Sequence, residues 1–322
     1  MRFPCAALMT RSDPPRIDPP PRRRLALRPL LVGVLGLAAL APSGPAAPSR
    51  ADPGQPGPER VAVCLRAAQC RETFVVAHRA LGFGAPENSI EAVDRALEHG
   101  IRVVKVDLRA SRDGEVFVLH DPTLDRTTTH RGEIADRTAS ALGTIRLRNG
   151  EPLPRFEDMY RRFAGRVVFV LDCKVDLTER VAGWMAAHGS LDDVVFLVGS
   201  AEHMRSLARA RARHPGILVA ARLVNWWDLP VIWEIFGGPP HFLHTDLTTA
   251  DDLAELRRRA SGVKVFVKAL DVERRIWPFG ELAVQAIVDA RPELVLTGAP
   301  VRFQQRIRER APTTGSHARA RP

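Results

Sequence analysis

The chain has 322 residues, of which 45% are hydrophobic and 6% are aromatic. This content is enough for one large core, so we expect one α/β domain with tails, and the few aromatic residues argue against a carbohydrate-stacking surface. The formal net charge is +10, but the excess lies at the two ends, in "RRRLALR" and in "RFQQRIRER" with "HARARP" behind it. Such clusters usually solvate a surface, so we expect no nucleic-acid partner.

Residues 1–51 have the order of an export signal. A basic cluster at 22–24 precedes an apolar stretch at 30–41 that is too short to span a bilayer, and small residues follow as far as Ala51. We therefore expect an exported protein, periplasmic or secreted, cleaved after Ala47 or Ala51. An uncleaved signal that anchors the chain is the alternative.

Residues 52–72 are predicted to form a Pro/Gly-rich linker, and residues 311–322 a basic disordered tail. Cys64 and Cys70 are six residues apart, so a small disulfide loop can form between them in an oxidising compartment. Cys173 stands alone in an apolar run and is expected to be a core residue. No Cys/His spacing typical of zinc sites is present.

Between residues 73 and 310, short β-branched runs alternate with helical patterns. One helix is expected at 89–99, where Ile90, Val93, Ala96 and Leu97 share a face ahead of Gly100. Eight strands separated by helices over about this length are typical of a (β/α)8 TIM barrel. A doubly wound open sheet is the alternative, although no Gly-rich loop follows the first strand. The expected strands are "FVVAH", "VVKVDLR", "VVFVLDCK", "VVFLVGS", "GILVAAR", "HFLHT", "VKVFVKA" and "ELVLTG".

Polar residues gather where these strands end, and in a barrel the carboxyl ends of the strands form the active-site face. A lone histidine or strand-end aspartate usually has a structural role, but four neighbouring strand ends carry such residues. They are His78 with Arg79, Lys105 with Asp107, His120 with Asp121, and Asp172 with Lys174.

The stretch "AHRALGFGAPENSIEAVDRALEHGIRVVKVDLRASRDGEVFVLHDPTLDRTT" resembles the amino-terminal half of glycerophosphodiester phosphodiesterases. The pattern of that family is HRG, PENT, E-x-D, T-x-D-G, HD and RTT. Further on, "LDCK" is similar to the E-x-K of the family, and "LVLTGAP" is similar to its T-D-x-P with Gly298 in place of Asp. The usual W-T-V-N segment is "FVKAL" here. The resemblance implies a barrel of the phospholipase-C-like phosphodiesterase type.

Carried over by position, the resemblance makes His78 and His120 the general acid and base. These roles suit the chemistry, because phosphodiester hydrolysis needs one proton removed from the nucleophile and one delivered to the leaving alkoxide. The resemblance also implies that Arg79 contacts the phosphate and that Glu87 and Asn88 bind or orient around the site. Lys174 matches the strand lysine of the family, and Asp107 and Asp172 match two of its metal ligands.

Lys105 departs from the family pattern, since it stands where E-x-D has a glutamate that holds a divalent cation such as Ca²⁺ or Mg²⁺. A cation about 4 Å from an ammonium group costs several kcal/mol at an effective dielectric constant near 20. We therefore expect the Lys105 ammonium to replace the cation, to clamp a phosphate oxygen and to pair with Asp107 and Asp172.

Three hypotheses follow: a phosphodiesterase with little or no metal, an enzyme that keeps the metal through Asp107 and Asp172, or a phosphate- or lipid-headgroup-binding protein without catalysis. A phospholipase acting on intact lipids is a related alternative. For that enzyme, "LVNWWDLPVIWEIFGG" is the nearest candidate for membrane contact, although Trp226, Trp227, Trp233 and Phe236 there also suit a buried helix, which we prefer. The substrate is a small-molecule phosphodiester, and the oligomeric state is left open.

Overall fold

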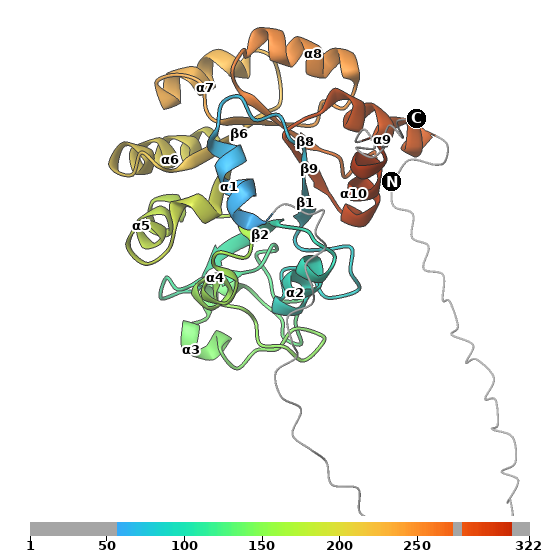
Figure 1. Cartoon of the computed structure of the whole chain (residues 1–322). Coiled ribbons are helices and arrows are strands. Elements are labelled where there is room, and N and C mark those ends of the chain that lie inside the picture. The colour runs from blue at the N-terminus through green and yellow to red at the C-terminus, as the bar shows by residue number, and fades with distance from the viewer. Residues whose placement is uncertain (1–56, 273–278, 311–322) are drawn as a thin grey trace, which may run out of the picture. The chain divides into compact units, whose positions relative to one another are not determined.

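A computed structural model describes residues 57–272 and 279–310. The predicted export signal, residues 52–56 of the predicted linker and the predicted carboxyl-terminal tail lie outside these residues. Eight parallel strands follow one another in the order β1–β9–β8–β7–β6–β5–β4–β2, and β1 also pairs with β2, so the sheet closes into a barrel (Figure 1). The ninth strand, β3, pairs antiparallel with β2 outside the ring. The predicted (β/α)8 barrel is confirmed.

All eight predicted strands are present. Their apolar runs are continuous because both faces of each strand are covered, one by the barrel interior and one by helices. The strands are β1 (Phe74–His78), β2 (Val103–Ala110), β3 (Val116–Val118), β4 (Val168–Cys173), β5 (Val194–Val198), β6 (Leu218–Leu223), β7 (Phe242–Thr245), β8 (Lys264–Lys268) and β9 (Leu294–Thr297).

The helices surround the barrel (Figure 1). The helix predicted at 89–99 is α2, and the Ser89 side chain caps it by accepting a hydrogen bond from the backbone N–H of Ala92. Within the described ranges, no helix is long and apolar enough to cross a membrane. The helices are α1 (Pro58–Arg66), α2 (Ile90–Glu98), α3 (Ala139–Leu142), α4 (Phe156–Phe163), α5 (Thr178–His188), α6 (Ala201–Arg213), α7 (Asp228–Phe236), α8 (Ala250–Arg259), α9 (Phe279–Ala290) and α10 (Pro300–Arg310), with short 3-10 turns at Ile134–Asp136 and Leu191–Asp193.

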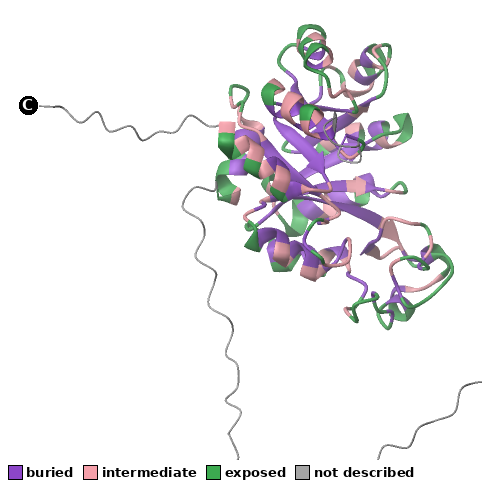
Figure 2. Ribbon diagram, turned by 90° about the vertical axis from the view of Figure 1, so that its right-hand side faces the viewer, coloured by how far each residue is buried: buried purple, intermediate pink, exposed green. Residues whose placement is uncertain are grey.

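The strands alternate between two apolar cores, as a side-chain period of two requires. Residues such as Val76, Val170 and Phe242 form the core inside the barrel, whereas residues such as Ala77 and Leu171 pack against the helices. Figure 2 shows the strands almost wholly buried and the exposed residues on the outer helices and loops. Cys173 belongs to the outer core, and burial raises the pKa of its thiol to about 12, so the expected core role is confirmed.

The predicted linker is wrong for residues 58–66, which form α1. Val61, Cys64 and Leu65 are spaced for one helix face, and they join the core inside the barrel. In Figure 1 this helix lies across the opening of the barrel. It begins with Pro58, a favourable first helical residue. Because Pro and Gly residues precede this short apolar pattern, the sequence was interpreted as a linker and the helix was not predicted.

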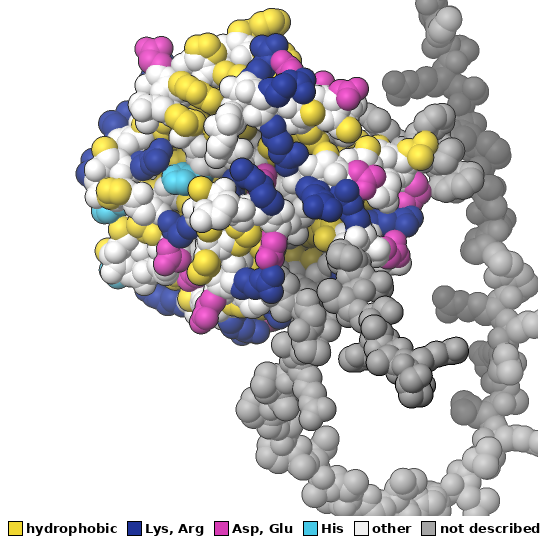
Figure 3. Space-filling view, turned by 45° about the horizontal axis from the view of Figure 1, so that its top comes forward, with side chains coloured by type: hydrophobic (Ala, Val, Ile, Leu, Met, Phe, Trp, Pro, Cys, Tyr) yellow, Lys and Arg dark blue, Asp and Glu magenta, His cyan; other side chains and the backbone are white. Residues whose placement is uncertain are grey.

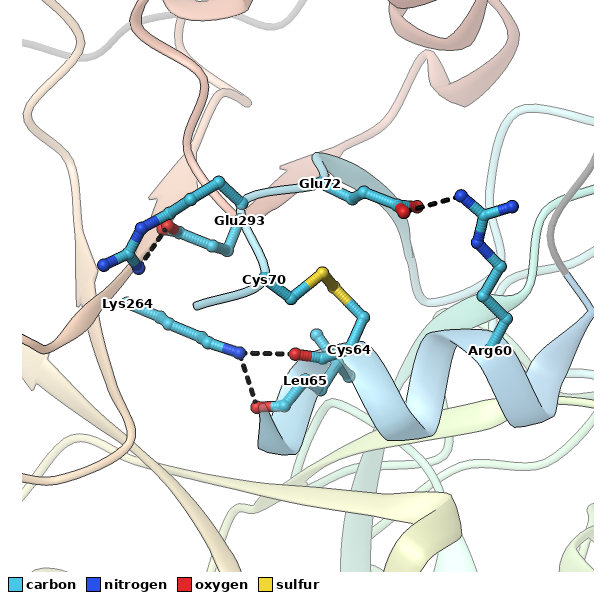
Figure 4. The surroundings of a disulfide bond; sticks show 8 residues. Arg60, Cys64, Leu65, Cys70, Glu72, Lys264 and Glu293 are labelled. Atoms are coloured by element: carbon cyan, nitrogen blue, oxygen red, sulfur yellow. Dashed lines mark hydrogen bonds and ion pairs between the residues drawn. A yellow bond between two sulfur atoms is a disulfide. The ribbon is translucent and has the colours of Figure 1, made fainter. Parts of the chain in front are cut away.

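Two cross-links hold α1 against the amino end of the barrel (Figure 4). The predicted disulfide between Cys64 and Cys70 is present, with 5.3 Å between the Cα atoms. The buried Lys264, the first residue of β8, donates hydrogen bonds to the carbonyl oxygens of Cys64 and Leu65, the latter at 2.9 Å. A strand residue thereby caps the last turn of α1, where carbonyl groups lack helical partners.

We expect Lys264→Met to lower the free energy of unfolding by about 1–3 kcal/mol, because it leaves two carbonyl groups without their charged donor. Urea denaturation measures the change. The control is Arg60→Met on the same helix, which removes an exposed ion pair with Glu72 and should cost clearly less stability, because exposed ion pairs contribute little. Equal losses in the two variants would contradict the capping role of Lys264.

Candidate active site

A pocket of about 350 Å³ opens at the carboxyl ends of the barrel strands. Both predicted histidines, His78 at the end of β1 and His120 after β3, line it. Asp107 is fully buried beside the pocket, where it contacts Lys105, one of the lining residues. The sequence prediction that these side chains share one face of the barrel is thereby met. The lining consists of His78, Arg79, Lys105, His120, Asp172, Lys174, Leu197, Gly199, Arg222, His244, Lys268, Leu270 and Leu296.

Two lysines and two aspartates form a compact charge cluster between β2 and β4. The strand register places Asp107 opposite Asp172. The Lys105 ammonium contacts Asp107 and lies 2.8 Å from Asp172 Oδ2, and the Lys174 ammonium lies 3.0 Å from Asp107 Oδ1 and 2.7 Å from Asp172 Oδ2. Each carboxylate is therefore held by both ammonium groups, and the formal charges cancel.

The ionised states of this cluster support one another. Burial alone disfavours the carboxylates, but Lys105 and Lys174 outweigh it and hold the pKa of Asp107 and of Asp172 below the usual value. Burial likewise acts to lower the pKa of Lys174, and the two aspartates reverse this and raise it. The two aspartates and Lys174 thus stay charged together.

The cluster does not fit a divalent cation. Ca²⁺ takes six to eight oxygen ligands and Mg²⁺ six, whereas Lys105 and Lys174 already occupy the side of both carboxylates where a shared cation would bind. Across residues 57–272 and 279–310, no group of three or more His, Cys, Asp or Glu side chains is arranged to hold a metal. Two ammonium groups would also repel the cation by several kcal/mol.

His78 is neutral in this surrounding. Burial, followed by the charges of Lys105 and Arg79, lowers the pKa of its imidazole to about 3. An imidazole that is unprotonated across the neutral range can accept a proton, so His78 suits the role of a general base.

His120 is oriented by a chain of charged side chains. Its Nδ1 lies 2.7 Å from Asp121 Oδ1, and Asp121 accepts a hydrogen bond of 2.5 Å from Arg126 Nε. Arg126 also donates to both oxygens of Glu87, and Glu87 accepts from Arg79. The chain therefore joins His120 to Arg79 and leaves the other ring nitrogen of His120 for a substrate. Asp121 was placed beside His120 at the strand ends but was given no role, and Arg126 was not predicted, although both lie in the quoted motif.

The loop between β1 and α2 fixes Arg79 and Asn88 in the left-handed backbone region, with φ values of 53° and 58°. The Asn88 N–H donates to the Arg79 carbonyl at 2.8 Å, and its side-chain amide donates to Asp107 Oδ2 at 3.1 Å. Ala80 has φ of 56° where the family pattern has glycine, and such strain costs about 1 kcal/mol. The loop therefore stores strain at the site, as functional loops often do.

Three further polar residues of the pocket, Arg222, His244 and Lys268, were missed from the sequence. Each lies near the carboxyl end of an apolar strand, and the period of two that places His78 and Lys105 inside the barrel would have selected them. A single polar residue in a strand is a weak signal by itself. It becomes informative only after all eight strands, and the face of each that points into the barrel, have been assigned.

The segment at 223–238 follows β6 at the same end of the barrel. The preferred buried-helix interpretation is right for Trp233 and Phe236, which lie in α7 and are half-buried against the core. Trp226 is half-buried too but precedes this helix, and Trp227, the residue before its first turn, is 75% exposed. Val224 and Val231 are exposed as well. On the face seen in Figure 3, apolar side chains are scattered among basic and acidic ones. Contact of this segment with a membrane stays a prediction.

Residues 78–184, from the end of β1 into α5, match the profile of the glycerophosphoryl diester phosphodiesterase family. A glycerophosphodiester phosphodiesterase of Caldanaerobacter subterraneus is 25% identical over 243 residues, which cover 70% of this chain and 97% of that protein. This part of the chain is therefore similar to the glycerophosphoryl diester phosphodiesterase family. A cattle member, glycerophosphodiester phosphodiesterase 1, is 34% identical over 104 residues, or 30% of this chain and 31% of that protein.

Solved structures of the family share the fold. A glycerophosphoryl diester phosphodiesterase of Parabacteroides distasonis superposes with a TM-score of 0.67 at 21% identity and covers 82% of this chain and 96% of its own. A phosphodiesterase of Oleispira antarctica, solved in complex with the product sn-glycerol-3-phosphate, has a TM-score of 0.56 at 20% identity, with coverage of 75% and 99%.

We expect the His78 imidazole of the folded protein to show no protonation between pH 8 and pH 5, and NMR of histidine-labelled protein, with His78→Gln to assign the signal, tests this. In the unfolded chain the same ring should titrate near 6.5. Because the folded pKa is the lower one, the contribution of His78 to stability is full above about pH 6.5 and falls as the pH is lowered toward 3. A folded-state midpoint near 6.5 would contradict the neutral base.

Proposed function

We propose that this protein hydrolyses phosphodiesters of the glycerophosphodiester type to an alcohol and glycerol phosphate. The observation that carries the proposal is the pocket in which His78 and His120 stand beside Arg79, Lys105 and Lys174. Two proton-transfer groups and three cations are what attack on an anionic diester requires. The relatives named as glycerophosphodiester phosphodiesterases support the same activity.

The two histidines divide the proton transfers. His78, which is neutral because its pKa is lowered to about 3, takes the proton from the attacking nucleophile. His120 delivers a proton to the leaving alkoxide through the ring nitrogen that does not face Asp121. Asp121 and Arg126 act as positioning residues, since they hold the ring and do not reach the pocket lining.

Arg79, Lys105 and Lys174 bind the phosphate. The planar guanidinium of Arg79 can donate two parallel hydrogen bonds to phosphate oxygens, and the two lysines supply point charges. Lys105 takes over the electrostatic task of the cation that the resemblance implied, and it does so as a covalently attached charge. No step of the reaction then depends on a metal.

The two other hypotheses keep less support. Retention of the metal by Asp107 and Asp172 conflicts with the ammonium groups on both carboxylates. A protein that only binds phosphate would not need the chain of charged residues that orients His120. The phospholipase alternative has one favourable feature, the exposed Trp227 beside the strand end.

We expect hydrolysis of glycerophosphocholine or glycerophosphoglycerol to survive exhaustive chelation, because Lys105 supplies the charge. Lys105→Glu restores the E-x-D pair with Asp107 and should lose at least about 100-fold in kcat/KM without metal and regain activity with Ca²⁺ or Mg²⁺. Lys105→Met should lose activity without gaining a metal response.

The control for this series is His120→Ala, which should be inactive with and without metal because it removes the proton donor. Wild-type activity that disappears on chelation and returns with metal would contradict the role of Lys105. Wild-type protein that hydrolyses no diester under either condition, yet binds glycerol phosphate in calorimetry, would favour the binding protein.

We also propose that the protein is exported. The Cys64–Cys70 disulfide supports this, since such bonds persist in oxidising compartments. Amino-terminal sequencing of the protein from its native host should find the chain starting between about residues 42 and 52. An intact Met1 terminus in the cytosol would contradict export, and an intact terminus in the membrane fraction would favour the anchored form.

A further inference from the structure

His244 lies on the inner face of the barrel, on the wall of the pocket opposite β2. The strand register aligns it with Arg222 on β6 and Phe266 on β8, and its ring meets that of Phe266 edge-on with 4.6 Å between the centroids. It lines the pocket although only 2% of its surface is exposed. A buried imidazole at this position is held firmly and faces whatever enters the pocket.

Neither ring nitrogen of His244 has a hydrogen-bond partner among the described residues. Burial of an unpaired polar group is unfavourable, so such a group in a pocket wall indicates a ligand atom. Burial, followed by the charge of Arg222, lowers the pKa of this imidazole to about 3. A neutral imidazole offers one donor and one acceptor. A hydroxyl group can accept a hydrogen bond from the N–H of the ring or donate one to the other ring nitrogen, so it suits either nitrogen.

The neighbouring part of the pocket wall also combines hydrogen-bond donors with an acceptor. Arg222 lies 2.5 Å and Lys268 3.3 Å from the carboxylate of Asp246, so cationic donors and an anionic acceptor stand side by side. This wall therefore offers both donors and acceptors to a hydroxyl group. Among the described residues, those that line the pocket include no Phe, Tyr or Trp, the side chains whose faces bind quaternary ammonium groups such as choline.

We propose that His244 is a specificity-determining residue that hydrogen-bonds a hydroxyl group of the polyol half of the substrate. The glycerol half then lies along β6, β7 and β8, with Arg222, Asp246 and Lys268 beside it, while the phosphate lies at His78, His120 and Lys105. The inference rests on the proposed function, and it names the half of the diester that is recognised on this wall.

Two chromogenic substrates with the same leaving group isolate the hydroxyl contact. Glyceryl para-nitrophenyl phosphate carries the two glycerol hydroxyls, and propyl para-nitrophenyl phosphate lacks them. Wild-type protein should prefer the glyceryl ester in kcat/KM. His244→Phe keeps an aromatic ring of similar size against Phe266, and we expect it to reduce that preference about five- to tenfold, by lowering kcat/KM for the glyceryl ester alone.

Two further variants separate recognition from folding. His244→Gln retains a donor and an acceptor and should keep part of the preference. His241→Phe makes the same exchange one residue before β7, where the histidine accepts a hydrogen bond from the Val219 N–H and does not line the pocket. It should leave the preference unchanged.

An equal loss of activity on both esters in His244→Phe, or an unchanged preference, would overturn the proposal and make His244 a packing residue. If wild-type protein hydrolyses neither ester, the proposed function fails by itself. Calorimetry with glycerol phosphate and propyl phosphate then decides the role of His244. Weaker binding of glycerol phosphate alone in His244→Phe supports the hydroxyl contact, and equal changes for both ligands refute it.

Discussion

The pairing of Lys105 and Lys174 with Asp107 and Asp172 is the interaction on which the candidate site depends. Four charges inside a barrel are stable only together, because removal of one partner leaves a buried charge without compensation. Asp107, the most buried of the four, also accepts a hydrogen bond from the Asn88 amide and lies 3.5 Å from Arg79, so the same carboxylate anchors the loop that carries Arg79. The cluster thereby fixes the positions of Asn88 and Arg79 at the edge of the pocket.

The barrel below this cluster is built to exclude water. Inner-facing residues of the strands form an apolar core, and α1 closes the amino end, where Lys264 and the disulfide hold it. Polar side chains on the inner face are therefore concentrated at the carboxyl ends, which leaves the pocket as the open end of an otherwise filled interior. A low effective dielectric constant beneath the pocket strengthens the attraction between the cations and an incoming phosphate.

The sequence was sufficient for the strands, because runs such as that from Val167 to Leu171 are apolar on both faces and suit a parallel barrel. It was also sufficient for the histidines, which stand in a recognisable motif. It did not predict α1, whose burial depends on strands far away in the chain. Nor did it predict that Lys174 shares both carboxylates with Lys105, since that contact depends on the register between β2 and β4. His244 was missed because only the three-dimensional structure shows that neither of its ring nitrogens has a hydrogen-bond partner among the described residues.

In the proposed mechanism a lysine takes the place of a metal, and this changes how the site is assembled. A metal centre gathers its ligands when the ion binds, whereas an ammonium group carried by the chain is placed when the barrel folds. Lys105 is nearly fully buried and touches both aspartates, so its position is fixed before any substrate enters. In the proposed reaction the glycerol hydroxyls must then be oriented by groups of the chain itself. The unpaired, neutral imidazole of His244 on the facing wall can supply such a partner.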